Sequence, residues 1–215
     1  MPEISPPAAK RPVVAAFDFD GTLTHRDTLL PFLIRSLGWP KLLRSLLLSA
    51  PWLAAYALRL MSNHRAKARL LQVSLAGWST VRAQREAEHF VDHYLSGQWR
   101  AWGLQQLVQH QRQGHRCVIV SASPGIYLHA VGVSLGVDAV LCTEMETEGG
   151  RYSGRMATPN CHGEQKVLRL QAWLRATLGE GALPELHAYG DTCGDLPLLH
   201  LADHAWYRGK PWRHS

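Results

Sequence analysis

The sequence predicts an α/β protein in which a doubly wound parallel sheet carries an inserted all-helical cap. Two observations carry this prediction. In the second half of the chain, short apolar stretches alternate with helix-like stretches, which is the pattern of a parallel sheet. The block 28–110 reads as helix throughout and lies between the first two apolar stretches. An all-helical segment inserted there would cover the sheet.

The first predicted strand is Val13–Phe19, an apolar run that ends in acidic residues and a glycine. The block that follows is rich in Leu, Ala, Gln and Arg, and prolines and glycines divide it into separate helices at Pro40, Pro51, Gly77 and Gly97. We therefore divide the chain into a core (12–24 and 108–215), a helical cap (25–107) and a disordered, Pro-rich tail (1–11).

From Gly114 onward, apolar and helical segments alternate. The further strands are predicted at Cys117–Val120, Val137–Thr143, Leu186–Tyr189 and His204–Tyr207. Helices are predicted from Pro124 to near Gly136, over Glu164–Leu178 and over Leu196–Leu201. Residues 143–156 predict a hairpin that turns at Gly149-Gly150.

Composition places the chain among globular proteins. With 215 residues, 46% hydrophobic and 19% charged, it is long enough for a buried core and too apolar for overall disorder. The four cysteines form no CxxC pair, which is typical of free thiols in a reducing compartment. The start MPEISPPAAKRP lacks the apolar core of a signal peptide, so we expect a cytoplasmic protein.

Positive charge is concentrated in the helical block. Arg26–Arg85 contains ten Lys or Arg and one acid, Asp27, a net charge of +9, whereas the whole chain has +6. Such a surface is either simply solvated or attracts an anion: a phosphate, an anionic lipid or a nucleic acid. A nucleic-acid partner is not expected, because the basic residues are interleaved with Leu and no nucleic-acid-binding motif is present.

The longest uncharged run in this block is Ser45–Leu58, which has 14 residues. A membrane span needs about 18 or more, and Pro51 interrupts the run, so no span is expected. The run suits a buried cap helix. Alternatively it is an interfacial helix with Trp52 and Tyr56 at headgroup level, which would give peripheral contact with the inner face of an anionic membrane.

Polar side chains follow three of the predicted strands. Asp18 and Asp20 follow the first, Ser121 the second, and Asp191 and Asp195 the strand Leu186–Tyr189. Because the carboxyl ends of parallel strands share one edge of a sheet, these residues should converge. Close carboxylates repel one another, and Mg²⁺, which prefers oxygen ligands and shares sites with phosphates, is the cation expected to neutralise them.

Two weaker signals belong to the same edge. Ser121 lies at a strand-to-helix junction, where its hydroxyl and the next backbone N–H groups form an anion cradle, although a serine there also commonly caps the helix. Lys166 either brings a positive charge to the site or is an ordinary solvated lysine. Gly21 permits the turn after Asp20.

In this order and spacing, the motifs resemble those of the haloacid dehalogenase (HAD) superfamily of phosphohydrolases. The match consists of DxDGT at Asp18–Thr22, Ser121 after a strand, Lys166, and GDxxxD from Gly190 to Asp195. The segments VSASP, GEQK and GDTCGDLPLL look most like subfamily IB, which contains phosphoserine phosphatase. The resemblance covers residues 13 to about 207, and it implies a Rossmann-like core, a type I cap and a Mg²⁺-dependent phosphatase.

The resemblance also implies residue roles. Asp18 would be the nucleophile that forms an aspartyl-phosphate, and Asp20 the general acid and then the base. Asp18, Asp191 and the carbonyl oxygen of Asp20 would bind Mg²⁺, and Asp195 would hold a metal-bound water or Lys166. Lys166 would balance the negative charge of Asp18 and of the phosphoryl group.

The phosphoryl oxygens would be held by Ser121 and nearby backbone N–H groups, with Gly21, Thr22 and Ala122 as further substrate contacts. In phosphoserine phosphatases, an acidic residue seven positions after the second Asp grips the substrate ammonium, and Asp27 has that spacing. Asp27 would alternatively cap the helix that follows it. In the same family, an arginine of the cap grips the substrate carboxylate. That arginine has no clear match here; Arg65, Lys67 and Arg69 are candidates by residue type only.

The substrate stays open between two classes. The Leu-rich basic block, Ser123-Pro124, Trp206 and Pro211 also resemble the bacterial phosphatidylglycerophosphatase C type. A lipid phosphate would explain a basic, Leu-rich and Trp-rich insert beside a phosphatase site. We prefer a soluble small-molecule phosphomonoester and keep a lipid phosphate as the alternative; the sequence does not indicate an oligomeric state.

Overall fold

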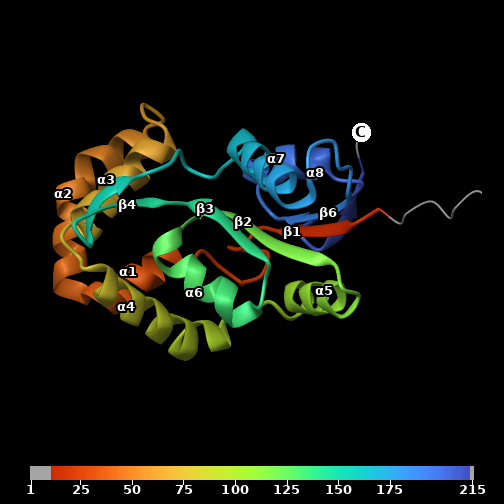
Figure 1. Cartoon of the computed structure of the whole chain (residues 1–215). Coiled ribbons are helices and arrows are strands. Elements are labelled where there is room, and N and C mark those ends of the chain that lie inside the picture. Colours follow the sequence, from red (N-terminus) through yellow and green to blue (C-terminus); the bar gives the residue numbers. More distant parts are fainter. Residues whose placement is uncertain (1–10, 214–215) are drawn as a thin grey trace, which may run out of the picture.

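Six strands form the central sheet in the order β3-β2-β1-β6-β7-β8 (Figure 1). The computed structural model describes residues 11–213, so the expected tail, apart from Arg11, lies outside the described residues. The parallel strands are β1 (Val13–Phe17), β2 (Arg116–Pro124), β3 (Ala139–Thr143), β6 (Glu185–Gly190) and β7 (His204–Tyr207), and β8 (Lys210–Trp212) pairs antiparallel with β7. The predicted doubly wound, mostly parallel sheet is confirmed.

Helices cover both faces of the sheet and extend beyond one end of it (Figure 1). Between β1 and β2 lie α1 (Leu29–Leu37), α2 (Trp39–Ala57), α3 (Asn63–Leu75), α4 (Thr80–His93), the short η1 (Leu95–Gly97) and α5 (Ala101–Arg112). After β2 come α6 (Gly125–Leu135), α7 (Glu164–Leu178), η2 (Cys193–Asp195) and α8 (Leu196–Leu201). In the described part of the chain, no helix is long and apolar enough to cross a membrane.

Side chains of β1 alternate between two hydrophobic clusters. Ala15 and Phe17 pack in a cluster that also contains Phe32 of α1 and Phe90 of α4, whereas Val14 packs in a second cluster with residues of α7 and α8. Both faces of the strand are therefore buried, which is why its sequence reads as one continuous apolar run. The first cluster also joins the sheet to α1–α4 in one hydrophobic core.

Four of the five predicted strands have other bounds in the structure. β3 begins at Ala139 rather than Val137, and β6 is one residue longer at each end than predicted. β1 ends at Phe17 rather than Phe19, because the chain turns there: the backbone N–H groups of Leu23 and Thr24 both donate to the carbonyl oxygen of Phe19. β2 continues past Val120 to Pro124, after a break in its register with β3. Ser121 therefore lies within an irregular strand end rather than after it.

The predicted hairpin is present as β4 (Met145–Glu148) and β5 (Arg151–Met156), with positive φ at both turn glycines. The sequence did not indicate what it packs against. β5 lies along α3, and the backbone of Tyr152 exchanges hydrogen bonds of 2.8 Å with Gly77 and Trp78. The hairpin thus follows β3 and packs against α3 (Figure 1).

Candidate active site

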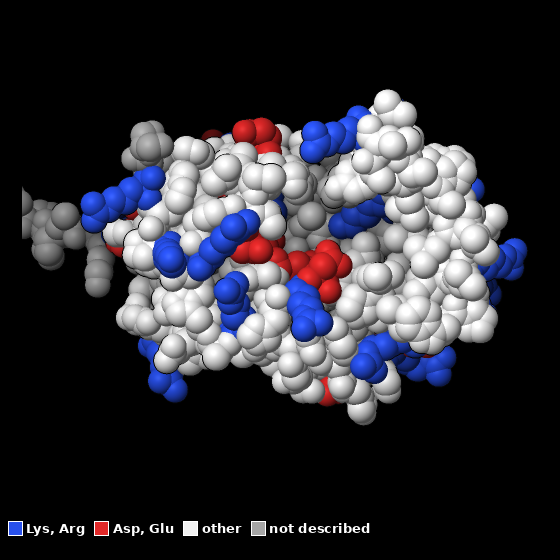
Figure 2. Space-filling view, turned by 180° about the vertical axis from the view of Figure 1, so that it is seen from behind, with Lys and Arg blue, Asp and Glu red and all other residues white. Residues whose placement is uncertain are grey.

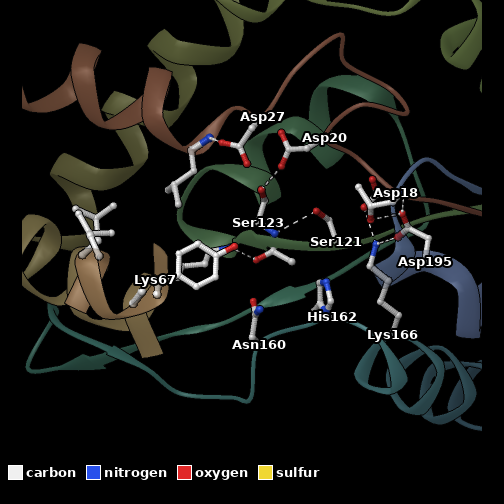
Figure 3. Close-up of a pocket in the computed structure, with 17 residues that line it drawn as sticks. Asp18, Asp20, Asp27, Lys67, Ser121, Ser123, Asn160, His162, Lys166 and Asp195 are labelled. Carbon is white, nitrogen blue, oxygen red and sulfur yellow. Dashed lines mark hydrogen bonds and ion pairs between the residues drawn. The ribbon is translucent and has the colours of Figure 1, made fainter. Parts of the chain in front are cut away.

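Three charged side chains form a buried triad at the carboxyl end of β1. Lys166 Nζ lies 2.6 Å from Asp18 Oδ1 and 2.6 Å from Asp195 Oδ1 (Figure 3). All three side chains are buried. Asp18 follows β1, Asp195 ends η2 after β6, and Lys166 lies in the first turn of α7, so the parallel topology brings them together from distant parts of the sequence.

Backbone constraints hold the two carboxylates in place. The amide of Asp18 donates to the carbonyl oxygen of Tyr189 on β6. Asp195 Oδ2 accepts from the backbone N–H groups of Asp191 and Thr192 and from the Thr192 hydroxyl, at 3.1, 2.9 and 2.8 Å. Gly190 is required here, because a Cβ at that position would collide with the Cβ of Asp195. The loop therefore fixes Asp195 before any ligand arrives.

Charge in the triad is unbalanced, because one ammonium faces several carboxylates. Burial raises the pKa of Asp18 well above its ordinary value, and Lys166 opposes that rise. Burial alone would lower the pKa of Lys166, but Asp18 and Asp195 outweigh it and raise this pKa, so Lys166 stays charged. Asp195 has a lowered pKa because Lys166 and the Thr192 hydrogen bonds outweigh its burial.

A third carboxylate, Asp191, adds to the excess of negative charge. Oxygen atoms of Asp18, Asp191 and Asp195 lie within 4.8 Å of one another. Burial, then the charge of Asp195, raises the pKa of Asp191. Its carboxylate fills the space over Gly21, where a Cβ would collide with it, and it accepts a hydrogen bond from Thr22 Oγ1 at 3.3 Å. Converging oxygens with surplus negative charge are the donor set that suits Mg²⁺.

The carboxylate of Asp20 belongs to a different set of contacts. Its Oδ1 accepts from the backbone N–H and the hydroxyl of Thr28, at 2.8 and 2.6 Å, and its Oδ2 accepts from the hydroxyl of Ser123. The Tyr127 hydroxyl completes this network by contacting both Thr28 and Ser123. Burial, then the charge of Asp27, raises the pKa of Asp20 to about 6. This carboxylate can therefore hold and release a proton near neutral pH.

Ser121 and Ala122 lie at the end of β2 beside these carboxylates. The Ser121 hydroxyl is buried and accepts a hydrogen bond from the backbone N–H of Ser123 at 3.1 Å. The carbonyl oxygen of Ala122 accepts from Lys67 Nζ at 2.7 Å and from the Thr143 hydroxyl at 2.9 Å. Ala122 is thus held between the helix α3 and the strand β3.

A cavity of about 350 Å³ opens over these groups, between the sheet edge and the helices (Figure 3). Most predicted site residues line it, namely Asp18, Asp20, Asp27, Ser121, Ala122, Lys166 and Asp195. Three other predicted residues, Gly21, Thr22 and Asp191, do not line the cavity. They contact one another instead: Thr22 donates to Asp191, and the Asp191 carboxylate lies against Gly21. The opposite wall of the cavity is mostly apolar and comes from α1, α2 and α3, with Leu29, Leu53, Tyr56 and Leu70.

Some lining residues were missed or only partly indicated. Of the three cap cations, Lys67 lines this cavity, whereas Arg65 and Arg69 line another hollow. Asn160 and His162 also line it, from the loop before α7, and neither was predicted as a site residue. Asp27 both lines the cavity and accepts from the backbone N–H of Leu29 at 3.0 Å, so it caps the start of α1 as well.

Comparison with known proteins gives one family and several relatives. A profile of the family described as haloacid dehalogenase-like hydrolase matches residues 15–200. Protein CicA of Caulobacter vibrioides is 31% identical, over 93% of this chain and 89% of its own length. A "probable phosphatase" of Mycobacterium tuberculosis is 26% identical, over 92% of this chain and 69% of its own length.

Solved structures share the fold at lower identity. A protein with unknown function from Bordetella pertussis superposes with a TM-score of 0.78 at 24% identity, and the match covers 92% of this chain and 89% of that one. A substrate-bound phosphoserine phosphatase superposes with a TM-score of 0.61 at 14% identity, covering 93% of this chain and 87% of that one. The arrangement of sheet and inserted helices is therefore common to these proteins.

Proposed function

Because this chain belongs to the haloacid dehalogenase-like hydrolase family, we propose that it is a Mg²⁺-dependent phosphomonoester hydrolase that forms an aspartyl-phosphate on Asp18. The substrate in this proposal is a soluble small-molecule phosphate. The observation that carries the proposal is the buried triad of Asp18, Lys166 and Asp195 beneath the cavity. The phosphatase names of several relatives support it.

In the first step, a carboxylate oxygen of Asp18 attacks phosphorus, and the bond between phosphorus and the leaving oxygen breaks. Asp20 gives its proton to that leaving oxygen, so an alcohol departs and Asp18 carries the phosphoryl group. In the second step, Asp20 takes a proton from water as the water oxygen attacks phosphorus. The Asp18–phosphoryl bond breaks, inorganic phosphate leaves, and both aspartates return to their starting states.

Neighbouring residues prepare the two aspartates for these different roles. Lys166 favours the ionised form of Asp18, while burial and Asp27 favour the protonated form of Asp20. Thr28 and Ser123 hold the Asp20 carboxyl in a fixed orientation. Ser121 and the backbone N–H of Ala122 would donate to the phosphoryl oxygens. When bound by Asp18, Asp191 and the Asp20 carbonyl, Mg²⁺ would supply positive charge against the carboxylates and the phosphate.

The cavity favours a small ester. It has a polar floor and an apolar wall, and its volume is about 350 Å³. Ordinary ligand pockets begin at about 300 Å³, so this cavity is among the smaller ones. Lys67 and Asp27 both face it, so a leaving group that carries charges of both signs would find partners there. This is the substrate chemistry that we favour.

One observation favours the second candidate, a lipid phosphate. Trp39, Leu43 and Leu47 are 69, 57 and 66% exposed, and at intervals of four residues they share one face of α2. Exposed Lys41 and Arg44 lie on the same helix. An apolar stripe with cations beside it suits an anionic membrane surface. Tyr56 of the same helix lines the cavity, so α2 connects this surface with the site of Asp18.

Phosphate release tests both candidates. The wild-type chain with Mg²⁺ would be assayed on p-nitrophenyl phosphate, phosphoserine, sugar phosphates, lysophosphatidate and phosphatidylglycerophosphate. We expect turnover to be strongest on a soluble ester, to fall about 10³-fold or more in Asp18→Asn, and to stop with EDTA. The exposed Asp92→Asn is the matched control and should keep full activity. Strongest turnover on the lipids would select the second candidate, and no Asp18-dependent release would contradict both.

A further inference from the structure

Three side chains outside the active site converge near the start of α6. His129 Nε2 lies 3.0 Å from Glu144 Oε1, Cys142 Sγ lies 3.2 Å from the same oxygen, and Cys142 Sγ lies 3.9 Å from His129 Nε2. They come from α6, β3 and the link between β3 and β4. None of them lines the catalytic cavity, and the proposed reaction does not use them.

These separations lie within about 0.2 Å of the range of edges of a tetrahedral metal site. Zinc lies about 2.0–2.3 Å from nitrogen, oxygen or sulfur ligands, so two ligands of one ion are about 3.2–3.7 Å apart. The described part of the chain holds two other groups of converging metal-binding side chains, at Asp18, Asp191 and Asp195 and at Glu185, His187 and His204. Only the group near α6 includes a thiol, which is a strong ligand for zinc.

Gly125 keeps open the space into which these ligand atoms point. A Cβ on Gly125 would lie 2.6 Å from Glu144 Oε2, 2.9 Å from His129 Nε2 and 3.1 Å from Cys142 Sγ. The φ of Gly125 is not positive, so its backbone conformation does not require glycine. The three ligand atoms require it, because they leave no room for a Cβ. Any other residue would fill the position that the ligands surround.

We propose that His129, Cys142 and Glu144 bind one zinc ion, with solvent in the fourth position. Cys142 is buried, while the side chains of His129 and Glu144 are 55 and 41% exposed, so a metal could enter from the His129 side. On binding, the Cys142 S–H bond is replaced by a sulfur–zinc bond and the proton passes to water. His129 ligates through Nε2 and keeps its proton on Nδ1.

A metal ion here would stabilise the contact that holds Ala122, a residue of the cavity lining, in place. Thr143, between Cys142 and Glu144, donates to the carbonyl oxygen of Ala122 at 2.9 Å. Zinc at this position would tie α6 to the end of β3 on either side of that contact. We therefore expect a structural ion that raises thermal stability, distinct from the Mg²⁺ of the proposed reaction.

Cobalt substitution tests the proposal. The full chain would be stripped with a chelator, returned to Mg²⁺, and titrated with Co²⁺ and with Zn²⁺. We expect one zinc per chain, a thiolate-to-cobalt charge-transfer band, and a melting temperature that rises by several degrees with zinc. Cys142→Ser should lose the band. His129→Gln and Glu144→Gln, at positions exposed enough to tolerate the change, should fold and should weaken binding about tenfold or more.

Two matched variants decide where the metal binds. Cys193→Ser removes the exposed thiol beside the catalytic aspartates, and His204→Gln disrupts the other histidine-containing group. Both should keep the band and the zinc-dependent rise in melting temperature. The proposal is overturned if the wild type gives no band, if Cys142→Ser retains it, or if either matched variant loses it.

Discussion

Lys166 is a buried ammonium shared between two carboxylates, at 2.6 Å from each. A buried charge is tolerated only when it is paired, and loss of one partner leaves the others uncompensated. Lys166 therefore contributes to stability as well as to the proposed chemistry. Its removal should affect both properties, and to a degree that an exposed lysine would not show.

We predict that Lys166→Met lowers the free energy of unfolding by about 3–5 kcal/mol and abolishes phosphate release. The reason is that Asp18 and Asp195 would face each other without a counter-charge. Urea unfolding followed by circular dichroism measures the first effect. Lys210→Met, at an exposed position of β8, is the control and should change neither property. A loss of activity with unchanged stability would contradict the electrostatic argument.

His110 is the residue from which we expect a pH dependence of stability. It is buried in α5, with Nε2 2.8 Å from the Tyr189 hydroxyl and Nδ1 2.7 Å from His115 Nδ1. Burial, then the charges of His187 and His115, lowers the pKa of His110 to about 4. The unfolded chain, with a pKa of about 6.5, binds this proton more readily. The stabilisation is therefore full above pH about 6.5 and is lost as pH falls toward 4.

We predict that the wild type loses more unfolding free energy between pH 7.5 and 5.0 than His110→Gln does, by about 1–2 kcal/mol. Urea titrations at the two pH values measure this difference. The exposed His93→Gln should lose as much as the wild type. Equal losses in the wild type and His110→Gln would show that His110 does not carry the effect.

The sequence indicated the residues at the carboxyl edge of the sheet better than those of the cavity wall. Asp18 and Asp195 follow apolar strands and Ser121 lies in the end of one, and the topology of a parallel sheet dictates where strand ends meet. Lys67 and Asn160 reach the cavity from a helix and a loop whose positions depend on packing between distant segments. No spacing rule encodes that packing, so Lys67 could be named by type only and Asn160 was missed.

At the scale of elements, α5 determines where the loop after Asp20 lies. Gly103 of α5 packs directly against the backbone of Thr22, and a Cβ at this glycine would collide with the Thr22 carbonyl oxygen. The side chain of Arg100, just before α5, donates to the carbonyl oxygen of Gly21. The helix α5 and the residue before it thus support the turn that follows Asp20.

We predict that Gly103→Ala destabilises the chain by about 1–3 kcal/mol and lowers kcat about tenfold or more, because the loop of Asp20 is displaced. Phosphate release and urea unfolding measure the two effects. Gly97→Ala is the matched control: nothing lies within 4 Å of its Cβ and its φ is not positive. An unchanged kcat in Gly103→Ala would show that the loop position tolerates the shift.

Elements with strong local signals were predicted closely. The helices Glu164–Leu178 and Leu196–Leu201 and the strand His204–Tyr207 have the predicted bounds. The strand β8 was missed because Lys210-Pro211-Trp212 is short and mostly exposed, and its pairing depends on the adjacent β7. The contact of the β4–β5 hairpin with α3 was missed for the same kind of reason, since it joins segments about 80 residues apart.

At the scale of the whole molecule, charge is unevenly distributed. The stretch Arg26–Arg85 carries a net charge of +9 in a chain of +6. On the face shown in Figure 2, acidic side chains gather near the middle and Lys and Arg side chains lie around them. An approaching phosphate ester would first meet the positive field of the surrounding residues.

We predict that kcat/KM for a phosphate ester falls several-fold as ionic strength rises from about 0.01 to 0.15 M, while kcat stays constant, because the screening length shrinks from about 30 to 8 Å. Replacing the exposed Arg44, Arg59 and Arg65 by Gln should reduce this salt dependence. Replacing Arg112, Arg175 and Lys210, which are exposed and lie outside that stretch, should leave it intact. A salt dependence that is the same in both variants would contradict steering by the basic stretch.

The position of α1–α5 between two neighbouring strands also has a consequence during synthesis. β1 pairs with β2 on one side and with β6 on the other, and both partners follow it by about 100 residues or more. A ribosome adding about 5–20 residues per second would take roughly 5–20 s to produce β2 after β1. The apolar strand that ends next to Asp18 therefore leaves the exit tunnel without a partner, and during that interval we expect the nascent chain to be a client of holding chaperones.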